Sequence, residues 1–143
     1  MVQNRFAGTW RLVSWENRST DAITYPFGQD AIGYIMYNED GYMFVAIMST
    51  NRPPFASGDI LGGSLEEKAA AAETLISYCG TYKIQRDRVI HHIEVSSFPN
   101  WVGVDQERIF EFKENRLVLS TPPLLVGGKQ QTAHLVWERV SPD

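Results

Sequence analysis

The sequence predicts an all-β protein: an eight-stranded antiparallel up-and-down β-barrel with one short helix at a barrel end. Three observations favour this fold class. Short runs with alternating hydrophobicity follow one another along the chain, tight turn signals separate them, and a single segment has the composition of a helix. A chain of 143 residues is expected to form one domain, spanning residues 1–143.

The expected strands follow one another in meander order. The run Thr9 to Glu16 alternates well, and the runs 31–38 and 42–49 flank Glu39-Asp40-Gly41, a hairpin turn whose glycine supplies positive φ. Further strands are expected at residues 77–85, 88–95, 104–113, 116–120 and 130–140. Reversals at Asp87, at residues 114–115 and at residues 127–128 separate them.

One helix is expected to interrupt the meander. Ser64 and Glu67 have the spacing of a capping box, and the run EEKAAAAETLIS at 66–77 has high helix propensity. The preceding residues 51–63, with Pro53 and Pro54, predict a loop at the same rim of the barrel. We expect the helix to form a lid or plug over one barrel end.

Composition argues against several classes of partner. A formal charge of −4 and a sequence pI near 5.3 do not suit nucleic acid, and lysines and arginines never stand side by side, so binding to a membrane surface is not expected either. One cysteine, Cys79, excludes an internal disulfide. The beginning MVQNRFAGTW has no apolar core typical of a secretory signal, which favours a cytoplasmic setting.

No cofactor or metal ion is expected. The pairs Gly62-Gly63 and Gly127-Gly128 lie outside any dinucleotide or phosphate-loop motif and are interpreted as turn glycines. His91 and His92 are adjacent, so on a strand they point to opposite sides and cannot hold one metal from the same face.

Alternation along each strand predicts which side chains point inward. The expected interior is rich in rings and contains small residues at Ser14, Ala46 and Gly80, which favours a cavity over a solid core. The expected inward set is Trp10, Leu12, Ser14, Tyr34, Met36, Tyr42, Phe44, Ala46, Met48, Tyr78, Gly80, Tyr82, His91, Ile93, Arg108 and Phe110.

Arg108 is the most informative residue of this set. It shares a strand face with Phe110 and lies opposite the acidic face that carries Glu107, so it should point inward, where an unpaired charge costs several kcal/mol to desolvate. Two interpretations stay open. In the first, Arg108 binds a carboxylate, enolate or carbonyl of a ligand. In the second, it has no ligand and either pairs internally with Glu16 or Glu138 or extends to the rim.

Other polar and aromatic residues complete the candidate site. His91 is either a hydrogen-bonded core residue or a general acid–base. Tyr78 and Tyr82 share one strand face and are either donors to an oxyanion or simple wall residues. Trp101 lies in the loop Phe98-Pro99-Asn100-Trp101, where it either caps a ligand or fixes the loop.

Several short segments together resemble a known family. The triplet Gly8-Thr9-Trp10 is similar to the Gly-x-Trp element near the start of lipocalins, where the tryptophan closes the barrel base beneath a late arginine, here Arg139. The wider set resembles the bacterial and fungal lipocalin-like domain family: GTWRLVSWE, YPFG, GYIMY, DGYM, RPP, SYCGTY, HHIEVS, PNWVG, QER and LVWERV. The resemblance implies a small eight-stranded barrel, related in shape to lipocalins and allene oxide cyclases, that binds small apolar molecules or acts as a cofactor-free cyclase or isomerase.

Three functions are therefore considered. The first is binding of a small, largely apolar molecule that has a carbonyl or anionic end. Arg108 and His91 would orient the polar end in a pocket of rings from Tyr34, Phe44, Tyr78, Tyr82 and Trp101. The second is a cofactor-independent cyclase, isomerase or dehydratase with His91, Arg108 and Tyr78 as catalytic residues.

The third and weaker function is a protein-interaction module with a filled barrel. Its contacts would be the presumed outward residues Trp15, Tyr37 and Ile109, with a homodimer as one possible assembly.

Overall fold

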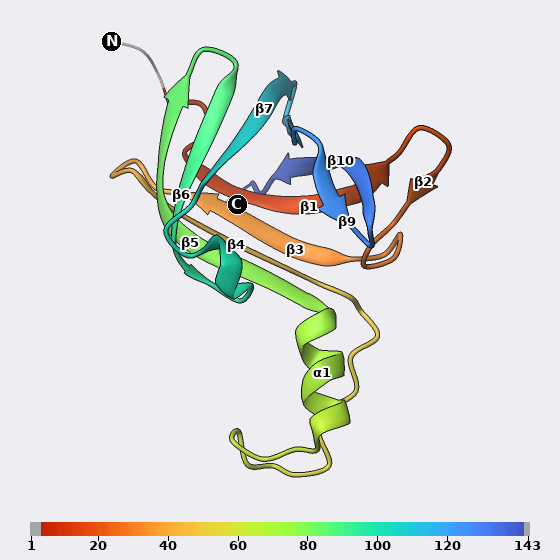
Figure 1. Ribbon diagram of the computed structural model, residues 1–143. Helices are drawn as coiled ribbons and strands as arrows, with labels where there is room; N and C mark the ends of the chain where they lie inside the picture. Colours follow the sequence, from red (N-terminus) through yellow and green to blue (C-terminus); the bar gives the residue numbers. More distant parts are fainter. Residues whose placement is uncertain (1–3, 142–143) are drawn as a thin grey trace.

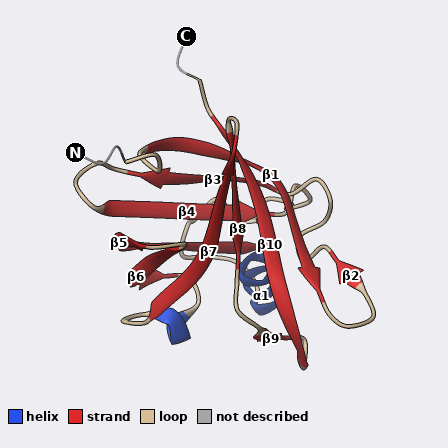
Figure 2. Ribbon diagram, turned by 90° about the horizontal axis from the view of Figure 1, so that it is seen from above, coloured by secondary structure: helices blue, strands red, loops and turns tan. Residues whose placement is uncertain are grey.

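Eight antiparallel strands close on themselves into a barrel in the computed structural model of the protein, which describes residues 4–141 (Figures 1 and 2). Ten strands are present, and β2 (Ile23–Thr24) and β9 (Leu124–Val126) pair only with β1 and β10, outside the ring. The ring is formed, in order, by β1 (Gly8–Arg18), β3 (Ile32–Tyr37), β4 (Tyr42–Met48), β5 (Leu75–Gln85), β6 (Arg88–Ser96), β7 (Asp105–Lys113), β8 (Arg116–Ser120) and β10 (Lys129–Arg139). The predicted fold class is confirmed.

The ladder between β1 and β10 closes the ring and contains an irregularity that reorients β1. Register runs from Trp10 opposite Arg139 to Arg18 opposite Thr132, with a shift between Leu12 and Ser14. A bulge of one residue reverses the alternation of inward and outward side chains beyond it. Trp15 therefore packs against the core, and the expectation that it points outward was wrong.

The inward faces of β3 and β4 are the reverse of the prediction. Ile35, Tyr37, Met43, Val45 and Ile47 are buried in the interior. Four side chains of the outward face, all expected inside, are between 42% and 54% exposed: Tyr34, Met36, Tyr42 and Phe44. Both faces of these strands are apolar, so alternation alone gives no polar side from which to choose. Tyr37, expected outside, is a central interior residue.

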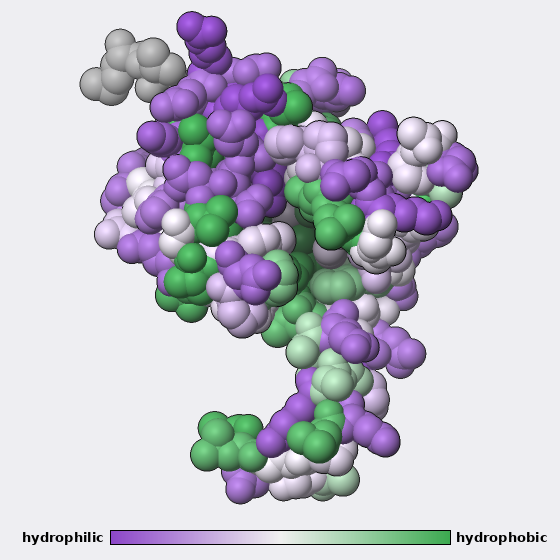
Figure 3. All heavy atoms as spheres, in the orientation of Figure 1, coloured by the Kyte–Doolittle hydropathy of each residue, from purple (hydrophilic) through white to green (hydrophobic). Residues whose placement is uncertain are grey.

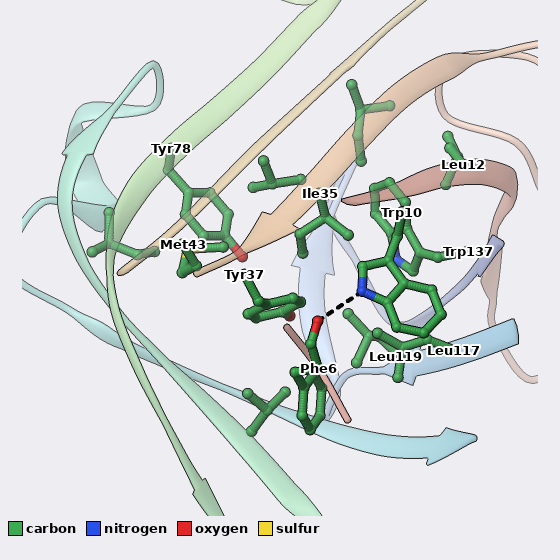
Figure 4. Packing of buried hydrophobic residues seen from close by; sticks show 14 residues of the cluster. Phe6, Trp10, Leu12, Ile35, Tyr37, Met43, Tyr78, Leu117, Leu119 and Trp137 are labelled. Carbon is green, nitrogen blue, oxygen red and sulfur yellow. Dashed lines mark hydrogen bonds between the residues drawn. The ribbon is translucent and has the colours of Figure 1, made fainter. Parts of the chain in front are cut away.

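An aromatic cluster seals one end of the barrel. The ring of Phe6 lies 5.0 Å from Tyr37, 4.8 Å from Phe110 and 5.0 Å from Phe112. The indole Nε1 of Trp10 donates to the Phe6 carbonyl at 2.9 Å (Figure 4).

Arg139 covers the Trp10 ring at this sealed end. Its guanidinium carbon lies 4.2 Å from the ring centroid, as the resemblance to lipocalins implies. Gly8 is required nearby, because its φ is +132° and a Cβ there would meet Arg139 Nη1 at 2.6 Å.

The helix α1 (Leu65–Glu73) begins at the predicted capping box of Ser64 and Glu67. It leads into β5 at the other barrel end but extends away from the barrel, and none of its residues is buried (Figure 1). The expectation of a lid or plug was therefore wrong. Within residues 4–141, neither α1 nor the short 3-10 turn η1 (Pro99–Trp101) is long and apolar enough to cross a bilayer.

Truncating the sealing ring should unfold the protein more easily. Phe6→Ala is expected to lower the free energy of unfolding by about 3–5 kcal/mol, because it removes a buried ring with four aromatic neighbours. Phe44→Ala is the matched control, and its outward ring should cost about 1 kcal/mol or less. Urea denaturation measures both, and an equal loss in the two variants would contradict the assigned faces of the barrel.

Candidate ligand-binding site

The barrel interior contains a cavity of about 90 Å³ near the end opposite the Phe6 cluster. All eight strands of the ring contribute to its wall, together with η1 and β9. The lining residues are Trp15, Ile35, Val45, Ile47, Ile76, Tyr78, His91, Trp101, Arg108, Leu119, Thr121, Leu124, Ala133, Leu135 and Trp137. On the face seen in Figure 3, hydrophobic residues border a hollow in the surface of the barrel. The wall is apolar with a few polar groups, as in small-molecule sites.

Arg108 is buried in this wall, with 8% of its surface exposed. Its Nη1 donates to Gln106 Oε1 at 3.2 Å and to the Glu107 carbonyl at 3.0 Å. No carboxylate in the described part of the chain forms a salt bridge with it. The positive charge of Arg108 thus has no acidic partner in the cavity.

Both acidic partners considered for Arg108 are engaged elsewhere. Glu16 pairs with Arg18 at 2.6 Å, and Glu138 accepts a hydrogen bond from Asn115 at 3.2 Å. The internal-pair interpretation of Arg108 was therefore wrong.

His91 is enclosed between two tyrosine hydroxyls. Tyr78 Oη lies 2.7 Å from its Nδ1 and Tyr37 Oη lies 2.7 Å from its Nε2, while 1% of the histidine is exposed. Burial, together with the nearby charge of Arg108, holds the pKa of His91 well below its usual value. His91 is therefore neutral at physiological pH.

The two tyrosines of this cluster remain protonated. Burial raises the pKa of Tyr78, and it raises the pKa of Tyr37 well above its usual value, while the charge of Arg108 opposes both shifts. The cluster is thus a neutral hydrogen-bonded chain beside one cation.

The structure brings together four of the predicted site residues and separates three. Tyr78, His91, Trp101 and Arg108 all line the cavity. Tyr34 and Phe44 are each 45% exposed on the outer surface, so their expected place in the pocket was wrong.

Tyr82 also lies outside the cavity lining. Its hydroxyl donates to the Asn38 carbonyl at 2.7 Å and accepts from Asn4 Nδ2 at 2.8 Å at the sealed end. The expectation that it faces a ligand beside Tyr78 was wrong, because the cavity occupies the other end of the barrel.

Several cavity residues were missed by the sequence analysis. Trp15 was missed because the bulge in β1 turns it inward. The inner face of β10 was not assigned, although the alternation of Ala133, Leu135 and Trp137 would have predicted it. Trp137 is 1% exposed. Its indole Nε1 is buried and has no hydrogen-bond partner among residues 4–141. Thr121 Oγ1 accepts a bond from the Ala133 amide at 2.9 Å.

The outer histidine of β6 belongs to a different environment. His92 Nδ1 lies 2.7 Å from Asp105 Oδ1 on the exposed side of the barrel. In the part of the chain that the structure describes, no group of three or more His, Cys, Asp or Glu residues could hold a metal ion.

The fold and this internal cavity define a small β-barrel of the lipocalin type. Residues 7–140 match the family described as the lipocalin-like domain, and the chain belongs to that family.

The chain is similar to a curated relative and to a solved structure. The 4'-hydroxy-3'-methoxypropiophenone carrier protein ppsC of Aspergillus oryzae is 34% identical over 107 residues, which cover 68% of this chain and 96% of that protein. A crystal structure of an uncharacterized protein from Bacteroides eggerthii is 12% identical with a TM-score of 0.47, covering 94% of this chain and 99% of that one.

Stability should fall in acid because of His91. In the unfolded chain this histidine takes up a proton near pH 6.5, whereas in the folded protein its lowered pKa keeps it neutral to lower pH. Below about pH 6.5 the unfolded state therefore binds more protons than the folded state. Below about pH 6.5 the free energy of unfolding should therefore fall by up to about 1.4 kcal/mol per pH unit from this group. Urea denaturation between about pH 7.5 and pH 5 measures the slope.

A histidine variant separates this contribution from the others. His91→Gln should flatten the acid slope, while His92→Gln, on the outer side of the same strand, should keep it. His134 has a pKa lowered by partial burial and by Arg18, so it adds a slope of the same sign in all three proteins. An unchanged slope in His91→Gln would contradict the assignment.

Proposed function

We propose that the protein binds a small, largely apolar aromatic molecule in the barrel cavity and acts as its carrier. The carbonyl or anionic oxygen of the ligand lies against Arg108, and Trp101 and Tyr78 contact its ring. The observation that carries this proposal is the buried guanidinium of Arg108, which has no acidic partner among residues 4–141 and lines a largely apolar cavity. A ligand oxygen offers the compensation that the protein does not.

The named ligand of the Aspergillus relative supports the proposed class. Its name specifies an aryl ketone: one aromatic ring that bears a carbonyl, a methoxy group and a phenolic hydroxyl. Such a molecule has the apolar body and the polar oxygen that the cavity wall requires. Eight-stranded barrels can hold one small ligand, and the cavity of about 90 Å³ would have to widen to admit a molecule of this size.

The geometry favours binding over the two other functions. A general acid–base needs a ring nitrogen within reach of the substrate, and both nitrogens of His91 are already bonded to tyrosine hydroxyls. A module that acts only through its surface would not need an interior cavity with a buried cation. Binding uses both features.

Replacing the buried cation by an apolar side chain should separate function from stability. Arg108→Met is expected to weaken binding of 4'-hydroxy-3'-methoxypropiophenone by about 10- to 100-fold, since a charge-assisted hydrogen bond contributes about 1.5–3 kcal/mol. The same variant should keep or raise the free energy of unfolding, because it removes an unpaired buried charge. Isothermal titration calorimetry and urea denaturation measure the two effects.

A surface arginine provides the control for this experiment. Arg11→Met removes an exposed arginine on the outer side of β1, near Tyr34, and should change neither quantity appreciably. Equal affinity in wild type and Arg108→Met would contradict the proposed role of the guanidinium.

A carrier should return its ligand unchanged. Incubation of the protein with the same aryl ketone, followed by chromatography and mass spectrometry, is expected to recover the compound without conversion. A new product that disappears in Arg108→Met and His91→Gln would instead identify an enzyme. Native mass spectrometry of protein purified from its own host would then identify the natural ligand by its retained mass.

A further inference from the structure

We infer that the Tyr37–His91–Tyr78 chain directs the hydroxyl proton of Tyr78 into the cavity, so that the pocket presents hydrogen-bond donors and selects ligands by their acceptor oxygens. Tyr78 is the contact residue, and Tyr37 and His91 are positioning residues. The ligand part of this inference rests on the proposed function. The direction of the hydrogen bonds is a property of the protein alone.

The first step concerns the charge of His91. A protonated imidazole would be a second buried cation beside Arg108, with no carboxylate among the cavity-lining residues to compensate either charge. His91 is therefore neutral and has one N–H and one bare nitrogen. Since each nitrogen contacts a tyrosine hydroxyl, one tyrosine donates to the ring and the other accepts from it.

The second step decides which tyrosine donates. Tyr37 is 1% exposed, does not line the cavity, and has no hydrogen-bond partner except His91 in the described chain. If Tyr37 accepted, its own hydroxyl proton would be buried without an acceptor, at a penalty that makes this arrangement rare. Tyr37 therefore donates to Nε2, and the proton of His91 resides on Nδ1.

The third step follows for Tyr78. Its oxygen accepts the Nδ1 proton, so its own proton is not used by His91. Tyr78 lines the cavity, in contrast to Tyr37, and Figure 4 shows it extending from β5 into the barrel interior. The cavity is the place where this proton finds an acceptor.

The remaining polar groups of the wall are also donors. Arg108 can only donate, whereas Trp137 Nε1, which has no partner among residues 4–141, is too deeply buried to meet a ligand in this structure. Thr121 Oγ1 already accepts from the Ala133 amide, which leaves its proton free. The lining contains no Asp, Glu, Asn or Gln side chain, so no carboxylate or side-chain amide oxygen is offered to a ligand donor.

The positions of these donors define the ligand further. Tyr78 and Arg108 both line the cavity, and both can donate to a ligand oxygen. A molecule with a carbonyl at the Tyr78 and Arg108 side satisfies these donors. Methoxy-substituted aryl ketones belong to this class.

Nitrogen NMR tests the direction of the hydrogen bonds in the ligand-free protein. Long-range ¹H–¹⁵N spectra of the ¹⁵N-labelled protein should show the His91 Nδ1 as protonated and its Nε2 as unprotonated, with the signals assigned by their loss in His91→Gln. The opposite tautomer would overturn the inference. Because no ligand is present, this result does not depend on the proposed function.

A matched ligand pair tests the selection of acceptors. The wild-type protein should bind 4'-hydroxy-3'-methoxypropiophenone at least about 10-fold more tightly than 2-methoxy-4-propylphenol, in which a methylene replaces the carbonyl and the bonds to both Arg108 and Tyr78 are lost. Tyr78→Phe should reduce this preference by about 3- to 10-fold, leaving the part that Arg108 provides. Tyr82→Phe is the matched control, because its hydroxyl is bonded at the sealed end, and it should retain the preference.

The possible outcomes separate the two proposals. Tight binding of both compounds with a preference unaffected by Tyr78→Phe would overturn the inference and leave the proposed function standing. If neither compound binds the wild-type protein, the proposed function fails, and the tautomer of His91 decides the inference. The infrared carbonyl band of the bound ketone should shift toward its non-hydrogen-bonded position in Tyr78→Phe, which distinguishes a lost bond from a distorted fold.

Discussion

A closed barrel requires every inward polar group to find its partner inside, and this constraint governs the interior of the protein. The ladder between β1 and β10 closes the ring, so that each ring strand pairs with two neighbours, and the polar side chains of the interior then need partners of their own. At the sealed end the polar side chains have partners. Trp10 donates to the Phe6 carbonyl, and Arg139 covers the Trp10 ring and donates to the Ala7 carbonyl. In the cavity some polar groups lack a partner, and these groups mark the candidate site.

The incomplete end has a consistent chemical character. Arg108 lacks an acidic partner, and Trp137 lacks any acceptor, among the described residues. A protein that needed only stability would replace a buried unpaired charge by an apolar side chain of similar size. The retained polarity supports the proposal that the interior recognises a ligand, and donors together with a cation favour a ligand with acceptor oxygens.

The sequence was sufficient for the fold class because that prediction depends on turns and on alternation, which are local. It also identified Arg108, His91, Tyr78 and Trp101, which lie on strands or turns where one face is clearly polar or the loop is short. It failed on Tyr34 and Phe44, because β3 and β4 are apolar on both faces and the choice between them is made by the neighbouring strands.

Two other errors have tertiary causes. Trp15 was assigned to the wrong face because the bulge after Leu12 exists only in the pairing of β1 with β10. Tyr82 was assigned to the right face but the wrong end, since the end of the barrel that the cavity occupies depends on which end Phe6, a residue distant in sequence, fills.

The reassignment of Tyr37 changes the chemistry more than any other correction. With Tyr37 outside, His91 would have one free nitrogen and would be a plausible proton carrier. With Tyr37 inside, both nitrogens are bonded, and burial and the nearby Arg108 keep the ring neutral. This change of strand face weighs against His91 as a proton carrier and supports its proposed role as a positioning residue, because neither ring nitrogen is left free to meet a substrate.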